Sequence, residues 1–180
     1  SGEPIDKYLM NGYSSISLGY IGLYEMCMAM FGKSNTDKVG HDFALKVMRH
    51  LNDKCEEWKN TDELLHGCSL YGTPSESLCY KFARKTEKRF GTIKGITDKD
   101  WFTNSYHVCV TEPIDAFEKL KFEAEFQRLS KGGAVSYIEV PNMSDNIEAL
   151  SEIVDYMYDT ILYAEINTRN GDVCGNCGYE

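Results

Sequence analysis

The sequence predicts an α/β protein with a largely parallel sheet, on the basis of three observations. Short runs of β-forming apolar residues alternate with longer segments whose apolar residues recur at three- and four-residue spacing. The short runs are separated by roughly a dozen residues or more, which is the length of a crossover between parallel strands. The chain has 180 residues, enough for one domain with a sizeable core. We therefore expect about five parallel strands joined by crossover helices.

The first half of the chain supplies two of the expected strands. SSISLGYIG at 14–22 is a short run of β-forming residues, and the helix-like LYEMCMAMF follows it at 23–31. GHDFALKVMRHLNDKCEEWKN at 40–60 is the clearest helix, because its apolar residues share one face. Those residues are Phe43, Val47, Met48, Leu51, Cys55 and Trp58. The next expected strand is CSLYG at 68–72.

The second half continues the alternation. Its expected helices are PSESLCYKFARKTEKRF at 74–90, DAFEKLKFEAEFQRLS at 115–130 and SDNIEALSEIVDYMYDTIL at 144–162, which has an Asp/Asn/Ser start. Its expected strands are TNSYHVCV at 103–110, AVSYIEVP at 134–141 and YAEIN at 163–167. The strands are fewer than the roughly eight that close the commonest barrel. We therefore expect an open or incomplete sheet.

Composition and charge indicate which classes of binding partner and which cellular compartment to expect. The net charge of −9, with Lys and Arg interleaved among Asp and Glu, disfavours binding to nucleic acid. The longest apolar stretch, at 20–31, contains Glu25 and is too short to cross a membrane. No signal peptide opens the chain, and the seven cysteines are an odd number without the spacing of a secreted disulfide framework. We expect a cytoplasmic protein with reduced thiols and no nucleic-acid or membrane partner.

The most informative local motif is YGTPSES at 71–77, between an expected strand and an expected helix. Thr73 is placed as the N-cap, Pro74 suits the first helical position, and Glu76 completes a capping box. The N–H groups of such a helix start attract anions. Hydroxyl groups that would surround a phosphate belong to Thr73, Ser75 and Ser77. A helix cap that binds no ligand is the alternative interpretation.

Histidines and most cysteines give weaker signals. Asn104 and His107 lie on an expected strand and would project into a site, although a strand histidine is more often structural and no triad is completed nearby. The other histidines, His41, His50 and His66, do not converge with Cys55 or Cys68 into a metal site. The cysteines with apolar neighbours are typical buried thiols: Cys27, Cys55, Cys68, Cys79 and Cys109.

The last cysteine pair differs from the others. Cys174 and Cys177 lie in CGNCG, where a glycine follows each cysteine as in a zinc knuckle. Two thiolates are too few for structural zinc, which is almost always four-coordinate. A thioredoxin-type redox motif fits poorly, because no helix is expected to follow Gly178.

Several blocks together resemble the anaerobic, class III ribonucleoside-triphosphate reductases. These blocks are SISLGYIGLYE at 15–25, LYGTPSESL at 70–78, TNSYHV at 103–108, GGAVSYIEVP at 132–141, and YAEIN followed by CGNCG. The resemblance implies a ten-stranded α/β barrel made of two five-stranded halves. Residues 1–167 would then be the second half-barrel, and residues 168–180 the start of a truncated zinc-binding C-terminal segment.

The resemblance also implies an oxygen-sensitive radical mechanism that makes deoxyribonucleotides for DNA synthesis. A glycyl radical, generated by a partner activase with S-adenosylmethionine and an iron–sulfur cluster, passes to a cysteine. The thiyl radical removes the ribose 3′-hydrogen of a nucleoside triphosphate, and the 2′-hydroxyl leaves as water. Formate or a thiol system supplies the electrons. The implied partners are the substrate, the activase, the remainder of the reductase chain and a second copy in a homodimer.

Carried over to this chain, the resemblance assigns two groups of site residues. The substrate-binding residues are Gly72, Thr73, Pro74, Ser75, Glu76 and Ser77, to which we add Asn104 because of its place at the start of an expected strand. Cys174 and Cys177 would be the first two of four zinc ligands. The chain ends before the second CxxC and before the RVCGY-type glycyl radical segment, and it begins after the thiyl-radical loop. We therefore expect no catalytic residue here, an inactive fragment and weak or absent zinc binding.

Two alternatives remain open at this stage. Another glycyl radical enzyme, such as a formate-lyase relative, would have the same barrel but not the zinc-type cysteines. A non-catalytic subunit that completes a barrel with a partner chain is the second alternative, because an isolated half-barrel leaves strand edges and an apolar face uncovered. The family often has proline where this chain has Cys109.

Overall fold

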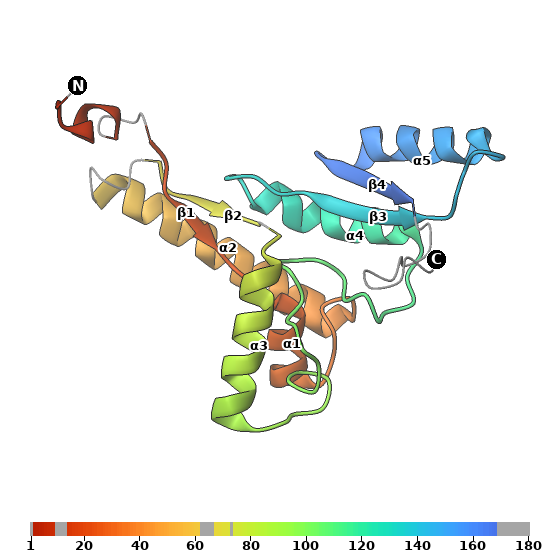
Figure 1. The fold of residues 1–180 in the computed structure, drawn as a ribbon, viewed down its shortest axis with the longest axis horizontal. Helices are drawn as coiled ribbons and strands as arrows, with labels where there is room; N and C mark the ends of the chain where they lie inside the picture. The colour runs from red at the N-terminus through yellow and green to blue at the C-terminus, as the bar shows by residue number, and fades with distance from the viewer. Residues whose placement is uncertain (1, 10–13, 62–66, 73, 169–180) are drawn as a thin grey trace.

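Four short strands and five α-helices make up most of the described structure. The computed structural model describes residues 2–9, 14–61, 67–72 and 74–168 (Figure 1). A short 3-10 helix, η1 (Ile5–Tyr8), precedes strand β1 (Ser17–Gly19). The α/β class expected from the sequence is confirmed.

The four strands are parallel and lie in the order of the sequence. β1 pairs with β2 (Ser69–Tyr71), and β3 (Ser136–Val140) pairs with β4 (Ala164–Thr168). A parallel bridge between Gly72 and Ala134 links the two pairs. The two two-stranded sheets thus follow one another in the order β1-β2-β3-β4, and we call the four strands together the strand wall.

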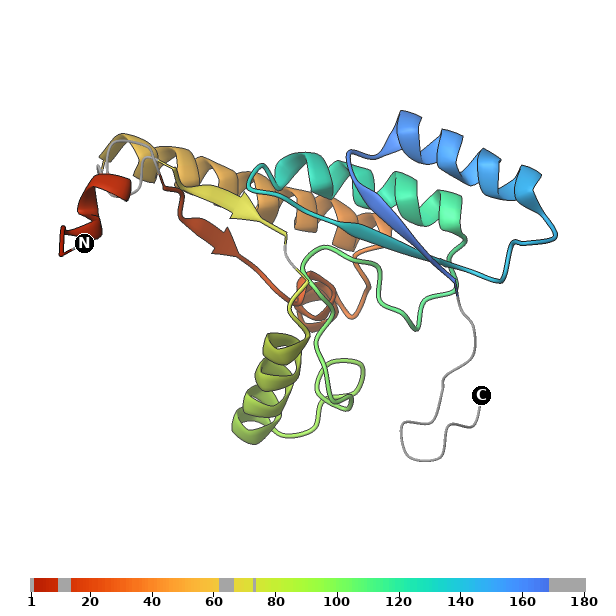
Figure 2. The same cartoon turned by 45° about the horizontal axis from the view of Figure 1, so that its top comes forward.

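Three helices cover one face of the strand wall (Figure 2). They are α2 (Lys38–Thr61), α4 (Ala116–Leu129) and α5 (Ile147–Thr160). Leu70 of β2 and Ile138 of β3 are almost completely buried against them. Burial of side chains of this size typically contributes about 1.5–3 kcal/mol each, which fixes the helices on this face. Helix α1 (Leu23–Phe31) packs on α2, and α3 (Glu76–Phe90) projects away from the wall (Figure 1).

The helix predictions agree with the structure at most boundaries. The clearest expected helix, 40–60, corresponds to α2, and 115–130 corresponds to α4. The Asp115 side chain caps α4 by accepting a hydrogen bond from the Glu118 N–H at 2.9 Å. Asn146 caps α5 in the same way through the Ala149 N–H at 3.2 Å, which confirms the Asp/Asn/Ser start. None of the helices in the described ranges combines the length and hydropathy needed to span a membrane.

The strand expected at 103–110 is wrong. These residues form a loop whose only ladder contact is a single antiparallel bridge between Asn104 and Ile21. Ser105 has a φ of 25°, outside the extended region, so a strand cannot continue through it. The described ranges therefore hold four strands where the sequence indicated about five.

The capping box expected at Thr73 is also wrong. Helix α3 begins at Glu76 with Ser75 as its N-cap, so Pro74 lies before the cap and not at the first helical position. The Ser75 side chain makes no capping hydrogen bond. Asn104 of the neighbouring loop instead holds the N-cap residue in place, because its Oδ1 accepts from the Ser75 N–H at 2.8 Å. Thr73 itself lies outside the described residues.

Candidate functional site

The loop Thr103–Cys109, which we call the clamped loop, is held by buried polar side chains from three other segments. Glu25 of α1 accepts hydrogen bonds from the Thr103 N–H and hydroxyl, both at 2.9 Å. Asn35 donates through Nδ2 to the carbonyl oxygens of Tyr106 at 3.3 Å and His107 at 3.4 Å. These bonds satisfy backbone groups that a strand ladder would otherwise pair.

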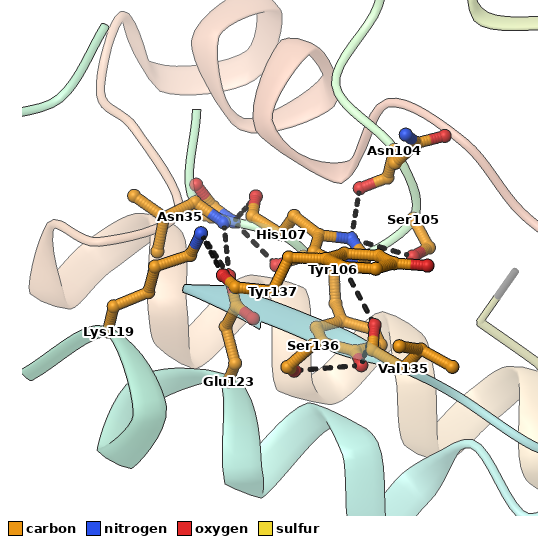
Figure 3. Close-up of polar contacts among 11 residues, drawn as sticks. Asn35, Asn104, Ser105, Tyr106, His107, Lys119, Glu123, Val135, Ser136 and Tyr137 are labelled. Carbon is orange, nitrogen blue, oxygen red and sulfur yellow. Dashed lines mark hydrogen bonds and ion pairs between the residues drawn. The ribbon is translucent and has the colours of Figure 1, made fainter. Parts of the chain in front are cut away.

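Helix α4 and strand β3 hold the other side of the clamped loop (Figure 3). Glu123 of α4 accepts from the Val108 N–H at 3.1 Å. The His107 Nε2 lies 2.9 Å from the carbonyl oxygen of Val135. The His107 Nδ1 lies 3.2 Å from both the Asn104 carbonyl oxygen and the Ser105 hydroxyl. The centroids of the Tyr106 and His107 rings lie 4.7 Å apart, and the rings stack. His107 is therefore held by polar contacts at its ring nitrogens and by the Tyr106 ring on its face.

Two buried carboxylates in this region are each accompanied by a lysine. Lys99 lies 2.5 Å from Glu25, and its ammonium also lies over the Trp101 ring at 4.2 Å. Lys119 lies 3.9 Å from Glu123 and donates to the Tyr137 carbonyl oxygen at 2.6 Å. A buried carboxylate without a countercharge would be strongly destabilising, so each lysine is part of the clamp.

The start of α3 meets the clamped loop at Asn104. Besides the bond from the Ser75 N–H, the Asn104 Oδ1 accepts from the Cys79 thiol at 3.0 Å. The structure therefore brings together Ser75 and Asn104, which the sequence singled out in separate segments. Gly72 lies where a Cβ atom would approach the Tyr106 ring to 2.8 Å, so this position has no room for a side chain. Ser77 is exposed on the first turn of α3.

A hollow of about 600 Å³, which we call the Asn104 hollow, lies beside this helix start. Its aromatic and apolar lining consists of Trp101, Phe102, Tyr137, Val108 and Val110. Its polar lining consists of Asn104, His107, Lys119, Glu139, Asn167, Thr103 and Cys79. Among the described residues that line it, Lys119 is the only lysine or arginine. Apolar walls with a few convergent polar groups are typical of small-molecule sites.

A second hollow of about 440 Å³ adjoins it and shares Lys119 and Glu139. Cys109 lies in its wall, with its sulfur 3.6 Å from the Lys99 ammonium and 3.2 Å from the Thr111 hydroxyl. Its neighbours are the apolar residues Val108, Ile138 and Val140. Cys109 is almost completely buried, so the structure gives it a packing role.

The described cysteines are reduced and buried, as the sequence predicted. Burial raises the pKa of the Cys27 thiol to about 11, and burial together with the neighbouring Cys68 raises the pKa of Cys55 to about 11. These two thiols therefore stay protonated and unreactive near neutral pH. Within the described ranges, no three His, Cys, Asp or Glu side chains cluster as a metal site. The predicted zinc ligands Cys174 and Cys177 lie outside those ranges.

Sequence reasoning missed three polar residues of the Asn104 hollow. Glu139 and Asn167 lie on predicted strands, and Lys119 lies on a predicted helix, but none was singled out. A signal was present in β3, where Ile138 and Val140 are buried and Glu139 between them is exposed. Alternation of this kind places every second side chain on the face opposite the core.

Comparison with known proteins identifies close relatives. A family model described as anaerobic ribonucleoside-triphosphate reductase matches residues 1–180. The chain is 39% identical over 179 residues to the anaerobic ribonucleoside-triphosphate reductase of Haemophilus influenzae, a match that covers 98% of this chain and 25% of the relative. It is 35% identical over 193 residues to the enzyme of the same name from Enterobacteria phage T4, covering 98% of this chain and 30% of that one. The chain thus spans about a quarter to a third of the length of these relatives.

Solved structures match the fold as well. An anaerobic ribonucleotide reductase has a TM-score of 0.73 at 17% identity, with 92% of this chain and 28% of that chain covered. The anaerobic ribonucleotide reductase of Thermotoga maritima with dATP bound in its specificity site has a TM-score of 0.67 at 17% identity, with 92% and 29% covered. At this identity, the likeness shows that the two proteins share the fold.

Proposed function

This chain belongs to the anaerobic ribonucleoside-triphosphate reductase family, and we propose that it supplies the part of such an enzyme that binds the triphosphate of the substrate. The observation that carries the proposal is the contact between Asn104 and the start of α3 at the edge of the Asn104 hollow. A helix start offers N–H groups and a positive dipole end to an anion. The exposed Ser77 hydroxyl adjoins this helix start.

Each part of the site has a distinct role in this proposal. The backbone and hydroxyl groups of Gly72–Ser77 would hold the phosphates, and Asn104 would fix the helix start that presents them. The Lys119 ammonium would add a positive charge on the far wall of the hollow. A small side chain at Gly72 would push against the Tyr106 ring, so glycine keeps the backbone close to the clamped loop.

The reaction itself would depend on groups outside the described residues. A radical generated by an activase with S-adenosylmethionine and an iron–sulfur cluster, and carried on a glycine and then a cysteine of the intact enzyme, would let the 2′-hydroxyl leave as water. The residues described here would bind and orient the nucleotide and keep the clamped loop in place. Membership in the family and the resemblance of the sequence blocks support this division of roles.

The proposed function also includes a zinc site and contacts with the rest of the reductase chain. Residues 1–167 would form half of a barrel, and residues 168–180 would begin a zinc-binding segment. The thiolates of Cys174 and Cys177 are the ligand type that structural zinc prefers, and two further ligands would come from elsewhere in the intact protein. The rest of the reductase chain would pair with the outer edges of β1 and β4, and two copies would form a homodimer.

The phosphate assignment can be tested in the intact reductase with Thr73→Ala and Ser75→Ala combined. We expect KM for the nucleotide to rise at least about a hundredfold, because two hydrogen bonds to a charged group, each worth about 1.5–3 kcal/mol, are removed. The Ser75 side chain makes no capping bond, so its loss alone should change stability by less than about 0.5 kcal/mol. Ser144→Ala removes an exposed hydroxyl far along the chain and serves as the control. A loss of thermal stability with unchanged KM would show that these hydroxyls support the fold and do not bind phosphate.

A further inference from the structure

Strands β3 and β4 present a matched pair of polar side chains on the face opposite the helices. Ile138 and Ile166 belong to the core cluster beneath α4 and α5, so their neighbours Glu139 and Asn167 point the other way. Glu139 and Asn167 are direct partners in the parallel register of β3 and β4. Both are exposed, and both line the Asn104 hollow. The pair therefore forms a polar floor under the hollow.

The hollow connects this floor to the start of α3. Asn104 lines the hollow and accepts from the Ser75 N–H, which marks the end where the phosphates are placed in the proposed function. Glu139 and Asn167 enter the same hollow from the two strands farthest along the wall. Trp101 and Tyr137 supply aromatic surface in the same lining. One ligand that fills the hollow would thus touch Asn104, which holds the residue before α3, and the carboxylate-bearing floor.

Charge decides which part of a nucleotide meets Glu139. A carboxylate repels phosphate but accepts hydrogen bonds through two oxygens, and a ribose offers two adjacent hydroxyl donors. An acidic side chain on the ribose hydroxyls is a known solution in nucleotide-binding folds. We propose that Glu139, with Asn167 beside it, binds the 2′- and 3′-hydroxyls of a ribonucleotide and so distinguishes it from the 2′-deoxy product. This inference rests on the proposed nucleotide-binding function.

The inference has a consequence for turnover. A product that lacks the 2′-hydroxyl loses one of the two hydrogen bonds to the Glu139 carboxylate. The remaining carboxylate oxygen then needs another donor, so the product is bound less tightly than the substrate. Glu139 would thereby favour release of the deoxyribonucleotide once the hydroxyl has left as water.

The test measures the equilibrium binding of CTP and dCTP to the intact reductase without radical activation. We expect the wild-type enzyme to bind CTP about tenfold more tightly than dCTP. Glu139→Gln keeps the side-chain size but replaces one acceptor by a donor, and it should weaken CTP about tenfold while dCTP changes less than about threefold. Asn167→Ala should weaken CTP to a smaller extent. Glu139→Asp, which keeps the charge, should fall between wild type and Glu139→Gln and serves if the latter variant does not fold.

Glu165→Gln is the matched control, because Glu165 is an exposed carboxylate on β4 that pairs with Tyr137 and does not line the hollow. Equal effects of Glu139→Gln and Glu165→Gln would overturn the inference, as would an equal loss of CTP and dCTP affinity in Glu139→Gln. The Thr73→Ala, Ser75→Ala variant separates the two proposals. If it weakens CTP and dCTP alike while Glu139→Gln changes neither, only the ribose assignment fails. If that variant changes neither nucleotide, the phosphate assignment fails.

Discussion

The helix-covered face of the strand wall is held by apolar contacts, whereas the clamped loop is held by buried polar side chains. On the covered face, Leu70 and Ile138 are enclosed by α2, α4 and α5. In the clamped loop, the carboxylates of Glu25 and Glu123 and the amide of Asn35 bond to backbone groups. Apolar contacts tolerate small changes of shape, while a polar clamp fails when one partner is removed. The comparison predicts where substitutions cost most.

The largest expected effect comes from the polar side of the comparison. Glu123→Ala in the intact protein would leave the Val108 N–H without its acceptor and Lys119 without its carboxylate. We expect a loss of about 3–5 kcal/mol in the free energy of unfolding, measured by denaturant titration. Glu125→Ala removes an exposed carboxylate from the same helix and should cost less than about 0.5 kcal/mol. Similar losses in both variants would show that the clamp contributes little.

A second test uses pH and the buried hydroxyl of Tyr106. Burial raises the pKa of Tyr106 to about 12, above the value of about 10 in an unfolded chain. The neutral phenol is favoured in the fold, so its contribution is complete below about pH 10 and is lost as pH rises toward 12. Over that window the unfolding free energy should fall by about 2–3 kcal/mol from this residue.

Tyr106→Phe isolates that contribution from the other tyrosines. Burial also raises the pKa of Tyr24 to about 12, so the wild-type slope contains more than one group. The variant should show a shallower decline between pH 10 and 12, measured as the difference between the two denaturant curves at each pH. Identical slopes in the two proteins would mean that the Tyr106 hydroxyl is not protected in the fold.

The smallest expected effect lies on the apolar side. Ile138→Val removes one methylene from a side chain that is almost completely buried between β3 and the helices. It should lower the unfolding free energy by about 1 kcal/mol, read from the denaturant midpoint. Ile147→Val at an exposed position should leave the midpoint nearly unchanged. A loss at Ile138 as large as that of Glu123→Ala would erase the contrast between the two regions.

The same contrast explains what the sequence could predict. The helices α2, α4 and α5 were predicted because their apolar spacing is a local signal that covers many residues. The clamped loop was predicted as a strand because SYHVCV is rich in β-forming residues. Its true partners, Glu25 and Asn35, lie more than seventy residues away in the chain. A pattern among neighbouring residues does not indicate contacts with residues so far away in the chain.

The candidate site also contains residues that local sequence patterns indicated and residues that they did not. Gly72–Ser77 was found through its helix-start pattern, and Asn104 was found through its place at the start of an expected strand. The capping partner of α3 was missed, because Asn104 lies 29 residues beyond Ser75. The sequence indicated only that Glu139 belongs to a strand with alternating apolar and polar residues. It did not indicate which other segments line the same hollow. The phosphate assignment of these residues stays a prediction.

Helix α4 spans the junction between the two strand pairs, which lies at the Gly72–Ala134 bridge. It contributes Phe126 to the core cluster under β1 and β2, and Leu120 and Ala124 to the cluster under β3 and β4. The Asn104 hollow is lined from both parts of the chain, by Cys79 of α3 and by Glu139 of β3. A displacement of α4 would therefore disturb both core clusters together. One helix thus holds the two strand pairs at a fixed spacing, because its side chains are buried under both of them.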